Sequence, residues 1–240
     1  MGQHVPFVTS EQMRRIDELA AKFFGLETVQ LMENSGRCIA SLARELLGGA
    51  EGKVISVLIG KGHNGGDAAV AARFLHNWGA EVHVAVADHP DNIEPLTKVQ
   101  LGVLRSMYVN IMYSVDFMKA DRYIKNSHLI IDGLLGYGVQ GDPRNDYATL
   151  IHIANNSGRK ILSIDIPSGL DPDTGEMRNP CIKAKWTLSM ALPKKGFLEK
   201  KAMQAVGELW IGDIGLPQEI FTMMELQVGN LFGRKEFTRV

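Results

Sequence analysis

The sequence predicts a three-layer α/β/α fold with a mostly parallel central sheet, preceded by two helices. From about residue 53 onward, short runs that are apolar at nearly every position alternate with longer segments of helical pattern. Strands that are apolar on both faces belong to a parallel sheet with helices on each side. The chain is 45% hydrophobic with a net charge of -1, so we expect a large core and no nucleic-acid partner.

Two helices are predicted before the first strand. Thr9-Ser10-Glu11-Gln12 has the pattern of an N-terminal capping box, and the amphipathic pattern continues to about Phe24. The second helix extends from Thr28 to about Leu47 and ends at Gly48-Gly49. Strands are then expected at Val54–Ile59, Val82–Ala87, His128–Ile131, Ile161–Ile164 and Trp186–Leu192, and helices at Asp67–Trp78, Pro95–Met107, Asp116–Lys125 and Tyr147–Asn155.

The remaining features indicate a single domain over residues 1–240 in the cytoplasm. Residues 193–206 are compatible with a helix, and residues 207–216 with a last edge strand. We expect no membrane association, because no apolar run reaches the ~18 residues of a membrane span and the N-terminus lacks a signal peptide. Cys38 and Cys181 have no metal-ligand spacing, which favours two reduced thiols.

Three polar, glycine-rich loops follow predicted strands: Gly60–Asp67 (GKGHNGGD), Asp132–Gly141 (DGLLGYGVQG) and Asp165–Asp171 (DIPSGLD). Ligands of open α/β sheets bind outside the carboxyl ends of the strands. We therefore expect the three loops to open at one rim. Their convergence is stronger evidence for a ligand site than any single motif.

The first loop has more than one interpretation. Gly60, Gly62 and Gly65 match a dinucleotide-binding pattern, and Asp88 ends the next strand where a ribose-binding acid belongs. The same glycines also suit a sharp turn from strand to helix. A helix beginning near Gly65–Asp67 would offer free N–H groups to a phosphate, and Asp67 could serve only as its cap.

The second loop begins with an aspartate at the end of a buried strand. Asp132 would be desolvated there and needs a partner, and its simplest role is to accept backbone N–H groups. The glycines that follow suggest a close approach of backbone to a ligand. Arg144 could meet a phosphate or pair with Asp142 or Asp146.

The third loop supplies a candidate acid or base. Asp165 could exchange protons with a ligand or could be a hydrogen-bonded turn residue, whereas Asp171 is expected to be a solvated turn residue. Asn64, Asp132 and Ser168 together offer an amide oxygen, a carboxylate and a hydroxyl. Hard cations prefer such ligands, and a single negative charge suits K⁺ better than a divalent ion.

In this order, the motifs G-x-G-x-N-G-G-D, D-x-L-L-G-x-G and D-I-P-S-G-L-D resemble the YjeF N-terminal domain family, the NAD(P)H-hydrate epimerases. The resemblance covers nearly the whole chain, including the later Ala191–Phe197 stretch (ALPKKGF). It implies a Rossmann-like fold, commonly dimeric, that interconverts the R and S epimers of hydrated NADH or NADPH (NADHX and NADPHX). A companion dehydratase, expected here on a separate chain, would then repair the S form.

The resemblance also implies roles for individual residues. Asp165 would contact the hydrated ring and act in catalysis, and Asn64, Asp132 and Ser168 would bind K⁺. The family pattern commonly has asparagine at His63, glycine at Ala68 and threonine at Tyr137. The implied nucleotide-binding residues are His63, Asn64, Gly65, Gly66 and Asp67 in the first loop, and Gly136, Tyr137, Gly138, Val139, Gln140, Gly141 and Asp142 in the second.

Two other functions remain open at this point. A YjeF-like module without catalysis, serving as a nucleotide-binding or scaffold domain, would explain the departures at His63 and Tyr137. An NAD-dependent dehydrogenase would explain the glycine pattern and Asp88, but it leaves the second and third loops without a role. For an epimerase, we expect Asp165 to exchange a proton with the C6 hydroxyl, with loss of water or ring opening giving a planar intermediate.

Overall fold

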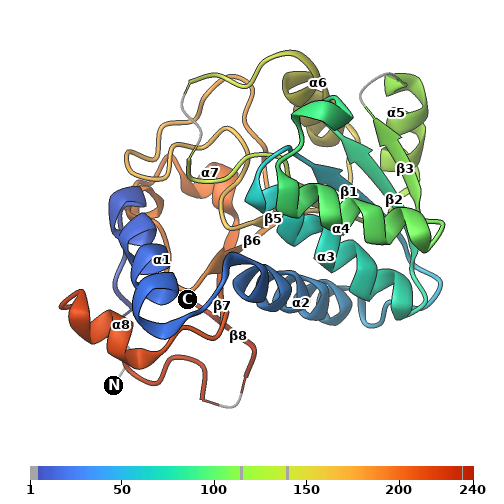
Figure 1. The fold of residues 1–240 in the computed structure, drawn as a ribbon. Coiled ribbons are helices and arrows are strands. Elements are labelled where there is room, and N and C mark those ends of the chain that lie inside the picture. The colour runs from blue at the N-terminus through green and yellow to red at the C-terminus, as the bar shows by residue number, and fades with distance from the viewer. Residues whose placement is uncertain (1–4, 114–115, 139–140, 234) are drawn as a thin grey trace.

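The computed structural model describes residues 5–113, 116–138, 141–233 and 235–240. Its centre is a sheet of eight strands in the order β3-β2-β1-β4-β5-β6-β7-β8, in which all neighbours are parallel except β7 and β8 (Figure 1). The strands are β1 (Val54–Ile59), β2 (Glu81–Val86), β3 (Asn110–Tyr113), β4 (Leu129–Gly133), β5 (Ile161–Ile164), β6 (Trp186–Met190), β7 (Glu208–Gly212) and β8 (Phe237–Arg239).

The helices lie between the strands as the sequence pattern predicts, after two that precede β1. They are α1 (Ser10–Phe24), α2 (Thr28–Leu47), α3 (His63–Asn77), α4 (Pro95–Ser106), α5 (Phe117–Asn126), α6 (Asn145–Asn156), α7 (Met203–Val206) and α8 (Gln218–Met223), with short 3₁₀ turns at Pro90–Asn92 and Lys195–Leu198. Both predicted N-terminal helices are confirmed. The capping box of α1 is formed by Thr9 and Gln12, and α2 ends at Gly48 in the left-handed conformation.

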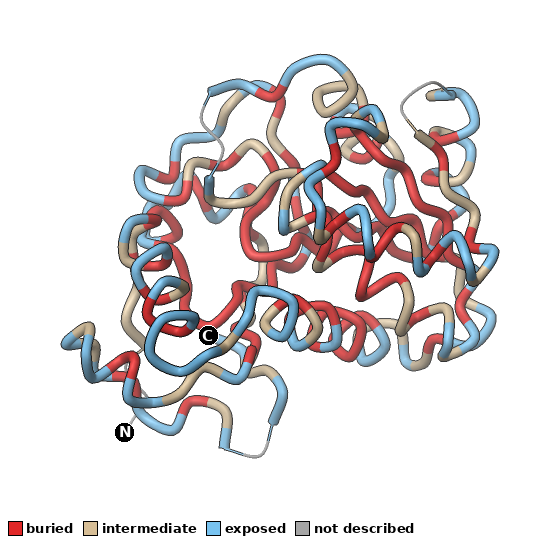
Figure 2. Tube along the Cα trace, in the orientation of Figure 1, coloured by how far each residue is buried: buried red, intermediate tan, exposed pale blue. Residues whose placement is uncertain are grey.

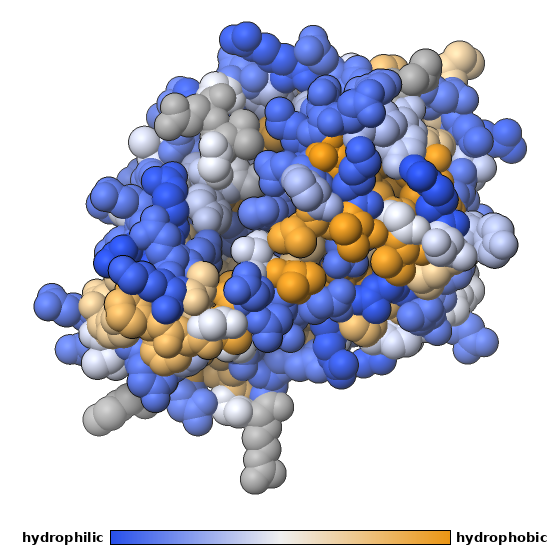
Figure 3. All heavy atoms as spheres, viewed as in Figure 1, coloured by the Kyte–Doolittle hydropathy of each residue, from blue (hydrophilic) through white to orange (hydrophobic). Residues whose placement is uncertain are grey.

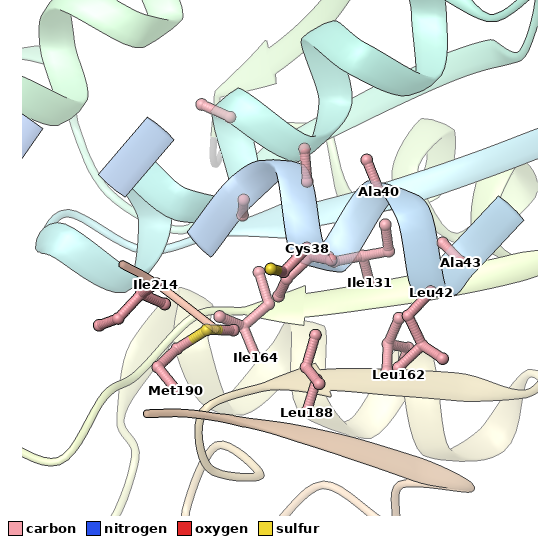
Figure 4. Packing of buried hydrophobic residues seen from close by; sticks show 14 of the residues in the cluster. Cys38, Ala40, Leu42, Ala43, Ile131, Leu162, Ile164, Leu188, Met190 and Ile214 are labelled. Atoms are coloured by element: carbon pink, nitrogen blue, oxygen red, sulfur yellow. The ribbon is translucent and has the colours of Figure 1, made fainter. Parts of the chain in front are cut away.

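Helices cover both faces of the sheet, which confirms the predicted three-layer architecture. Buried residues of α2, α3 and α4 belong to one hydrophobic cluster, and those of α5 and α6 belong to another on the opposite face (Figure 1). The strands between them are almost entirely buried (Figure 2). In the first cluster, α2 lays Cys38 and Leu42 against Ile164 and Leu188 of the central strands (Figure 4).

The structure differs from the prediction at four elements. β3 was not predicted, because its run is short and half-buried. β7 is not the edge strand, since β8 pairs with its outer side. Residues 193–206 form a 3₁₀ turn and one helical turn instead of one helix, and α3 begins four residues earlier than predicted, at His63.

The surface in Figure 3 is mostly polar, and both cysteines are free thiols. The face shown in Figure 3 is mostly hydrophilic, and apolar atoms gather where α4 lies, which carries the exposed Val99 and Val103. Within the described residues, no helix is both long and apolar enough to cross a membrane. Cys38 and Cys181 are free thiols, and burial raises the pKa of each to about 12, so neither is a nucleophile at neutral pH.

The topology decides where a ligand can bind. β1 has β2 on one side and β4 on the other, so the chain leaves the sheet in opposite directions from two neighbouring strands. Such a reversal opens a crevice at the carboxyl ends of the strands. The ends of β1, β4, β5 and β6 are adjacent there, with Asp132 of β4 level with Leu58 and Ser163 of its neighbours.

Candidate active site

A cleft of about 1020 Å³ lies at this crevice. Its volume is at the upper end of the range for small-molecule sites, which suits a ligand as long as a dinucleotide. All three predicted loops contribute to its walls, together with α1 and the first half of α2. Of the predicted site residues, those that line it are His63, Asn64, Asp67, Gly136, Tyr137, Gly138, Gly141, Asp142 and Asp165.

The first loop leads directly into α3. Gly62 is the N-cap, so His63 and Asn64 lie in the first turn, and their N–H groups have no acceptor within the helix. Asp67 lies in the second turn and is therefore not the cap, contrary to one of the predicted alternatives. The His63 ring is 58% exposed, with Nε2 3.4 Å from Glu94 Oε2, so this departure from the family pattern stays at the rim.

Gly65 and Gly66 lie behind the cleft and do not line it. A Cβ on Gly65 would be 2.0 Å from the carbonyl oxygen of Gly60, and one on Gly66 would be 2.4 Å from Met32 Cε. These glycines allow close packing of α3 against β1 and α2. Asp88 also lies away from the cleft lining, where it accepts hydrogen bonds from Asn92 and Tyr147. Gly65 and Asp88, two of the features that favoured a dehydrogenase, therefore have other roles.

The described residues of the second loop line one side of the cleft. The Tyr137 hydroxyl donates to Asp17 Oδ2 of α1 at 2.7 Å and so ties this loop to the first helix. Asp142 accepts from the backbone N–H of Asn179 at 3.1 Å. Among the described residues, Arg144 makes no ion pair with Asp142 or Asp146, and it lines the cleft as an exposed cation. Val139 and Gln140 lie outside the described residues.

The third loop places Asp165 at the end of β5 with a positive φ of 62°. A left-handed conformation is uncommon for a residue other than glycine and persists only where its surroundings hold it. Here the surroundings include Lys194, whose Nζ lies 2.6 Å from Asp165 Oδ1. Asp171 is a turn residue, as we predicted, but it is only partly exposed, because its carboxylate accepts from backbone N–H groups of the turn and pairs with Arg178.

The cleft carries a concentration of carboxyl groups. Burial raises the pKa of Asp67 well above its usual range, and the nearby Asp165 and Asp17 raise it further. Burial also raises the pKa of Asp17, although the hydrogen bond from Tyr137 opposes this effect. Asp67 has no hydrogen-bond donor among the described residues. An unpaired carboxyl with a raised pKa keeps its proton to higher pH than an ordinary aspartate and can serve as a proton donor.

Asp132 and Ser168 lie behind the cleft lining, and the backbone of Leu135 links them to Asn64. Asp132 is fully buried and accepts four hydrogen bonds, including one of 2.6 Å from Ser168 Oγ. Burial raises the pKa of Asp132, and no cationic side chain of the described residues pairs with it. Asn64 Nδ2 donates to Leu135 O, and no described residue donates to the Asn64 amide oxygen.

This donor set fits a monovalent cation. Amide, carbonyl and hydroxyl oxygens are hard ligands, and the negative charge of Asp132 would be compensated by a cation next to Ser168. Asp132 already accepts four hydrogen bonds, so its carboxylate would not contact the cation directly. It would contribute its negative charge, with the Ser168 hydroxyl between it and the cation. The described residues contain no cluster of His, Cys, Asp or Glu that could hold a metal such as zinc.

Two residues of the site were missed from the sequence. Asp17 lies on a helix whose amphipathic pattern gives no sign of a functional side chain. Lys194 belongs to a Pro-Lys-Lys segment that we interpreted as the start of a helix. A lysine within four residues of the end of a buried strand was the available signal, since the carboxyl ends of strands point to the site.

Comparisons with known proteins agree with this architecture. The family model described as YjeF-related protein N-terminus matches residues 28–196. A protein of Dehalogenimonas lykanthroporepellens named NAD(P)H-hydrate epimerase is 35% identical over 94% of this chain and 89% of its own length. One of Rhodopirellula baltica with the same name is 34% identical over 90% of this chain and 87% of its own.

Other relatives are longer. The bifunctional NAD(P)H-hydrate repair enzyme Nnr of Dictyoglomus turgidum is 35% identical, and the match covers 89% of this chain but only 41% of that protein. A crystal structure of the yeast protein ynu0 has the same fold, with a TM-score of 0.86 over 98% of this chain and 21% identity. With the family model matching most of its length, the chain belongs to the family of YjeF-related protein N-termini.

Proposed function

We propose that this chain is an NAD(P)H-hydrate epimerase, which interconverts the R and S epimers of NADHX and NADPHX. The observation that carries the proposal is Asp165, a carboxylate held at the carboxyl edge of the sheet with one side open to a dinucleotide-sized cleft. The names of two relatives that match this chain over most of both lengths support it.

The cleft suits a dinucleotide in one orientation. Its interior is acidic, with Asp17, Asp67 and Asp165, whereas Arg144 and the first turn of α3 offer positive charge nearer the rim. Phosphates favour cations and free helix N–H groups. The hydrated nicotinamide ring would therefore lie inside against Asp165, and the diphosphate would lie toward α3.

The proposed reaction exchanges the hydroxyl on C6 of the ring. The C6–O bond breaks, and the hydroxyl leaves as water with a proton from the Asp67 carboxyl. The ring nitrogen shares its electron pair with C6, which gives a planar cation that the carboxylates stabilise. Water then adds to the opposite face and passes its proton to Asp165. C6 recovers a hydroxyl of opposite configuration with no oxidation or reduction, and proton transfer back to Asp67 completes the cycle.

We propose K⁺ as the cofactor of this site. Asn64, Ser168 and the Leu135 carbonyl would hold it, with Asp132 supplying the negative charge. When bound, K⁺ would supply a fixed positive charge beside the loops that approach the ligand. Ser168 accepts from Leu135 N at 2.9 Å, so the same residues already tie the second loop to the third.

The test is direct conversion of substrate. Purified R-NADHX is incubated with the protein, with and without K⁺, and formation of the S epimer is followed by chromatography. We expect acceleration by the wild type, and loss of turnover in Asp165→Asn with ligand binding largely retained. A wild-type rate equal to the spontaneous rate would favour the alternative, a nucleotide-binding or scaffold module without catalysis.

The remaining expectations belong to the same proposal. We expect a homodimer in the cytoplasm, with a separate NAD(P)H-hydrate dehydratase as its functional partner. The longer relatives named bifunctional repair enzymes support the functional link, since each joins a matching segment to additional chain. Size-exclusion chromatography with light scattering would test the dimer.

A further inference from the structure

The strongest feature outside the three predicted loops is a buried amino group. We propose that Lys194 is a positioning residue of the epimerase reaction, which holds Asp165 by one carboxylate oxygen and leaves the other as the reacting oxygen. This inference rests on the proposed function, because it assigns the reacting atom of that same site. Lys194 does not line the cleft, so it would act through Asp165.

The two oxygens of Asp165 have different surroundings. Oδ1 accepts from Lys194 Nζ at 2.6 Å, from Met190 N at 3.0 Å and from Ser189 Oγ at 3.4 Å. No described residue donates to Oδ2. The two closer donors, Lys194 Nζ and Met190 N, already occupy both lone pairs of Oδ1, whereas no described donor occupies those of Oδ2. Because Asp165 lines the cleft, Oδ2 is the oxygen available to a ligand.

Lys194 is itself held firmly. Its side chain is 0% exposed, and Nζ also donates to Leu192 O at 3.0 Å and Ser189 Oγ at 3.2 Å. The backbone on both sides of Lys194 is hydrogen-bonded to Val8: Val8 N donates to Pro193 O at 2.9 Å, and Lys195 N donates to Val8 O at 2.7 Å. An ammonium group is buried at great cost unless it is paired, and Asp165 is the only described carboxylate within ion-pair distance.

The charges around Asp165 make this partner important. Asp17 of α1, Asp67 of α3 and the Tyr137 hydroxyl of the second loop face the same space. Lys194 is the buried cation paired with Asp165, and Arg14 and His63 line the same cleft without an ion pair to it. Carboxylates that lie close together repel each other, and a neighbouring ammonium offsets this repulsion. Lys194 therefore places a positive charge beside Asp165 in an otherwise acidic space, and it holds one carboxylate oxygen of a residue whose backbone has a positive φ.

The test compares Lys194→Met with Lys195→Met, a matched control at the exposed neighbouring position. In Lys194→Met we expect kcat to fall about 10²-fold, as for misplacement of a reacting group. KM for R-NADHX should change by less than about threefold, because Lys194 does not touch the ligand. Lys195→Met should match the wild type.

A second measurement separates this role from general destabilisation. Thermal unfolding is followed for Lys194→Met, Asp165→Asn and the double variant. If Lys194 acts through Asp165, the unfolding midpoint falls less when Lys194→Met is added to Asp165→Asn than when it is added to the wild type. Residual turnover of Asp165→Asn should not fall further in the double variant.

Three results would overturn the proposal. The first is a kcat of Lys194→Met within about threefold of that of Lys195→Met. The second is an effect of Lys194→Met on KM alone. The third is an unfolding midpoint of the double variant that equals the sum of the shifts of the two single variants. A wild type without epimerase activity would instead refute the proposed function, and with it the role of Lys194 in that reaction. The unfolding cycle needs no substrate and would still decide whether Lys194 holds Asp165.

Discussion

Replacement of Ser168 by alanine tests the network beneath the cleft. The substitution removes one hydroxyl, which donates to Asp132 Oδ1 at 2.6 Å and accepts from Leu135 N at 2.9 Å. Loss of a hydrogen bond to a charged group costs about 1.5–3 kcal/mol, and loss of a neutral one costs about 0.5–1.5 kcal/mol. We therefore expect the free energy of unfolding to fall by about 2–4 kcal/mol.

Urea unfolding followed by circular dichroism measures this loss. With a slope of about 2 kcal/mol per molar, the midpoint should fall by about 1–2 M. Ser163→Ala is the matched control, because its buried hydroxyl donates only to the other oxygen of Asp132, at 2.8 Å. We expect that variant to lose about 1.5–3 kcal/mol, from one hydrogen bond instead of two.

Potassium then distinguishes the two serines. A cation that binds only the folded state raises the unfolding midpoint, so the wild type should unfold at higher urea in K⁺ than in Na⁺. Ser163→Ala should keep this difference, and Ser168→Ala should lose it. A loss of less than about 1 kcal/mol in Ser168→Ala would refute the network, and a full potassium response in that variant would refute the proposed cation position.

Three further predictions follow from single sites. The pKa of Asp67 is raised in the folded state, so the free energy of unfolding of the wild type falls as pH rises through that raised pKa. Asp67→Asn should therefore unfold at higher urea than the wild type at about pH 8. Its unfolding midpoint should also depend less on pH between about pH 4 and pH 8. Gly65→Ala places a Cβ 2.0 Å from Gly60 O and should cost about 1–3 kcal/mol, whereas Gly102→Ala, with open space around its Cβ, should not destabilise. Arg144→Ala should weaken binding of an adenine dinucleotide in calorimetry without a change in the unfolding midpoint, and equal affinity would contradict its role as a phosphate contact.

Much of the fold could be predicted because its signals are local. The capping box at Thr9, the glycine after Leu47 and the apolar run at Val54–Ile59 each act within a few residues. The order of strands and helices then predicts a parallel sheet with a ligand crevice at one edge. β3 escaped prediction because only one of its four residues is buried, so no continuous apolar run marks it.

The candidate site was predicted less completely. Three loops could be placed at one rim, because the carboxyl ends of parallel strands lie together. The motifs could not distinguish glycines that face a ligand from glycines that allow packing. Gly65 belongs to the second kind, and only the position of the Gly60 carbonyl reveals it.

By itself, the sequence determined the fold class, the three loops and the position of Asp165, since backbone pattern and turn chemistry act over short stretches of chain. Only the tertiary structure decided which charges meet. Lys194 is 29 residues from Asp165, and Asp17 is 120 residues from Tyr137, yet both pairs are in hydrogen-bond contact. The energy of a buried charge depends on the groups that folding places around it, and no local pattern in the chain records them.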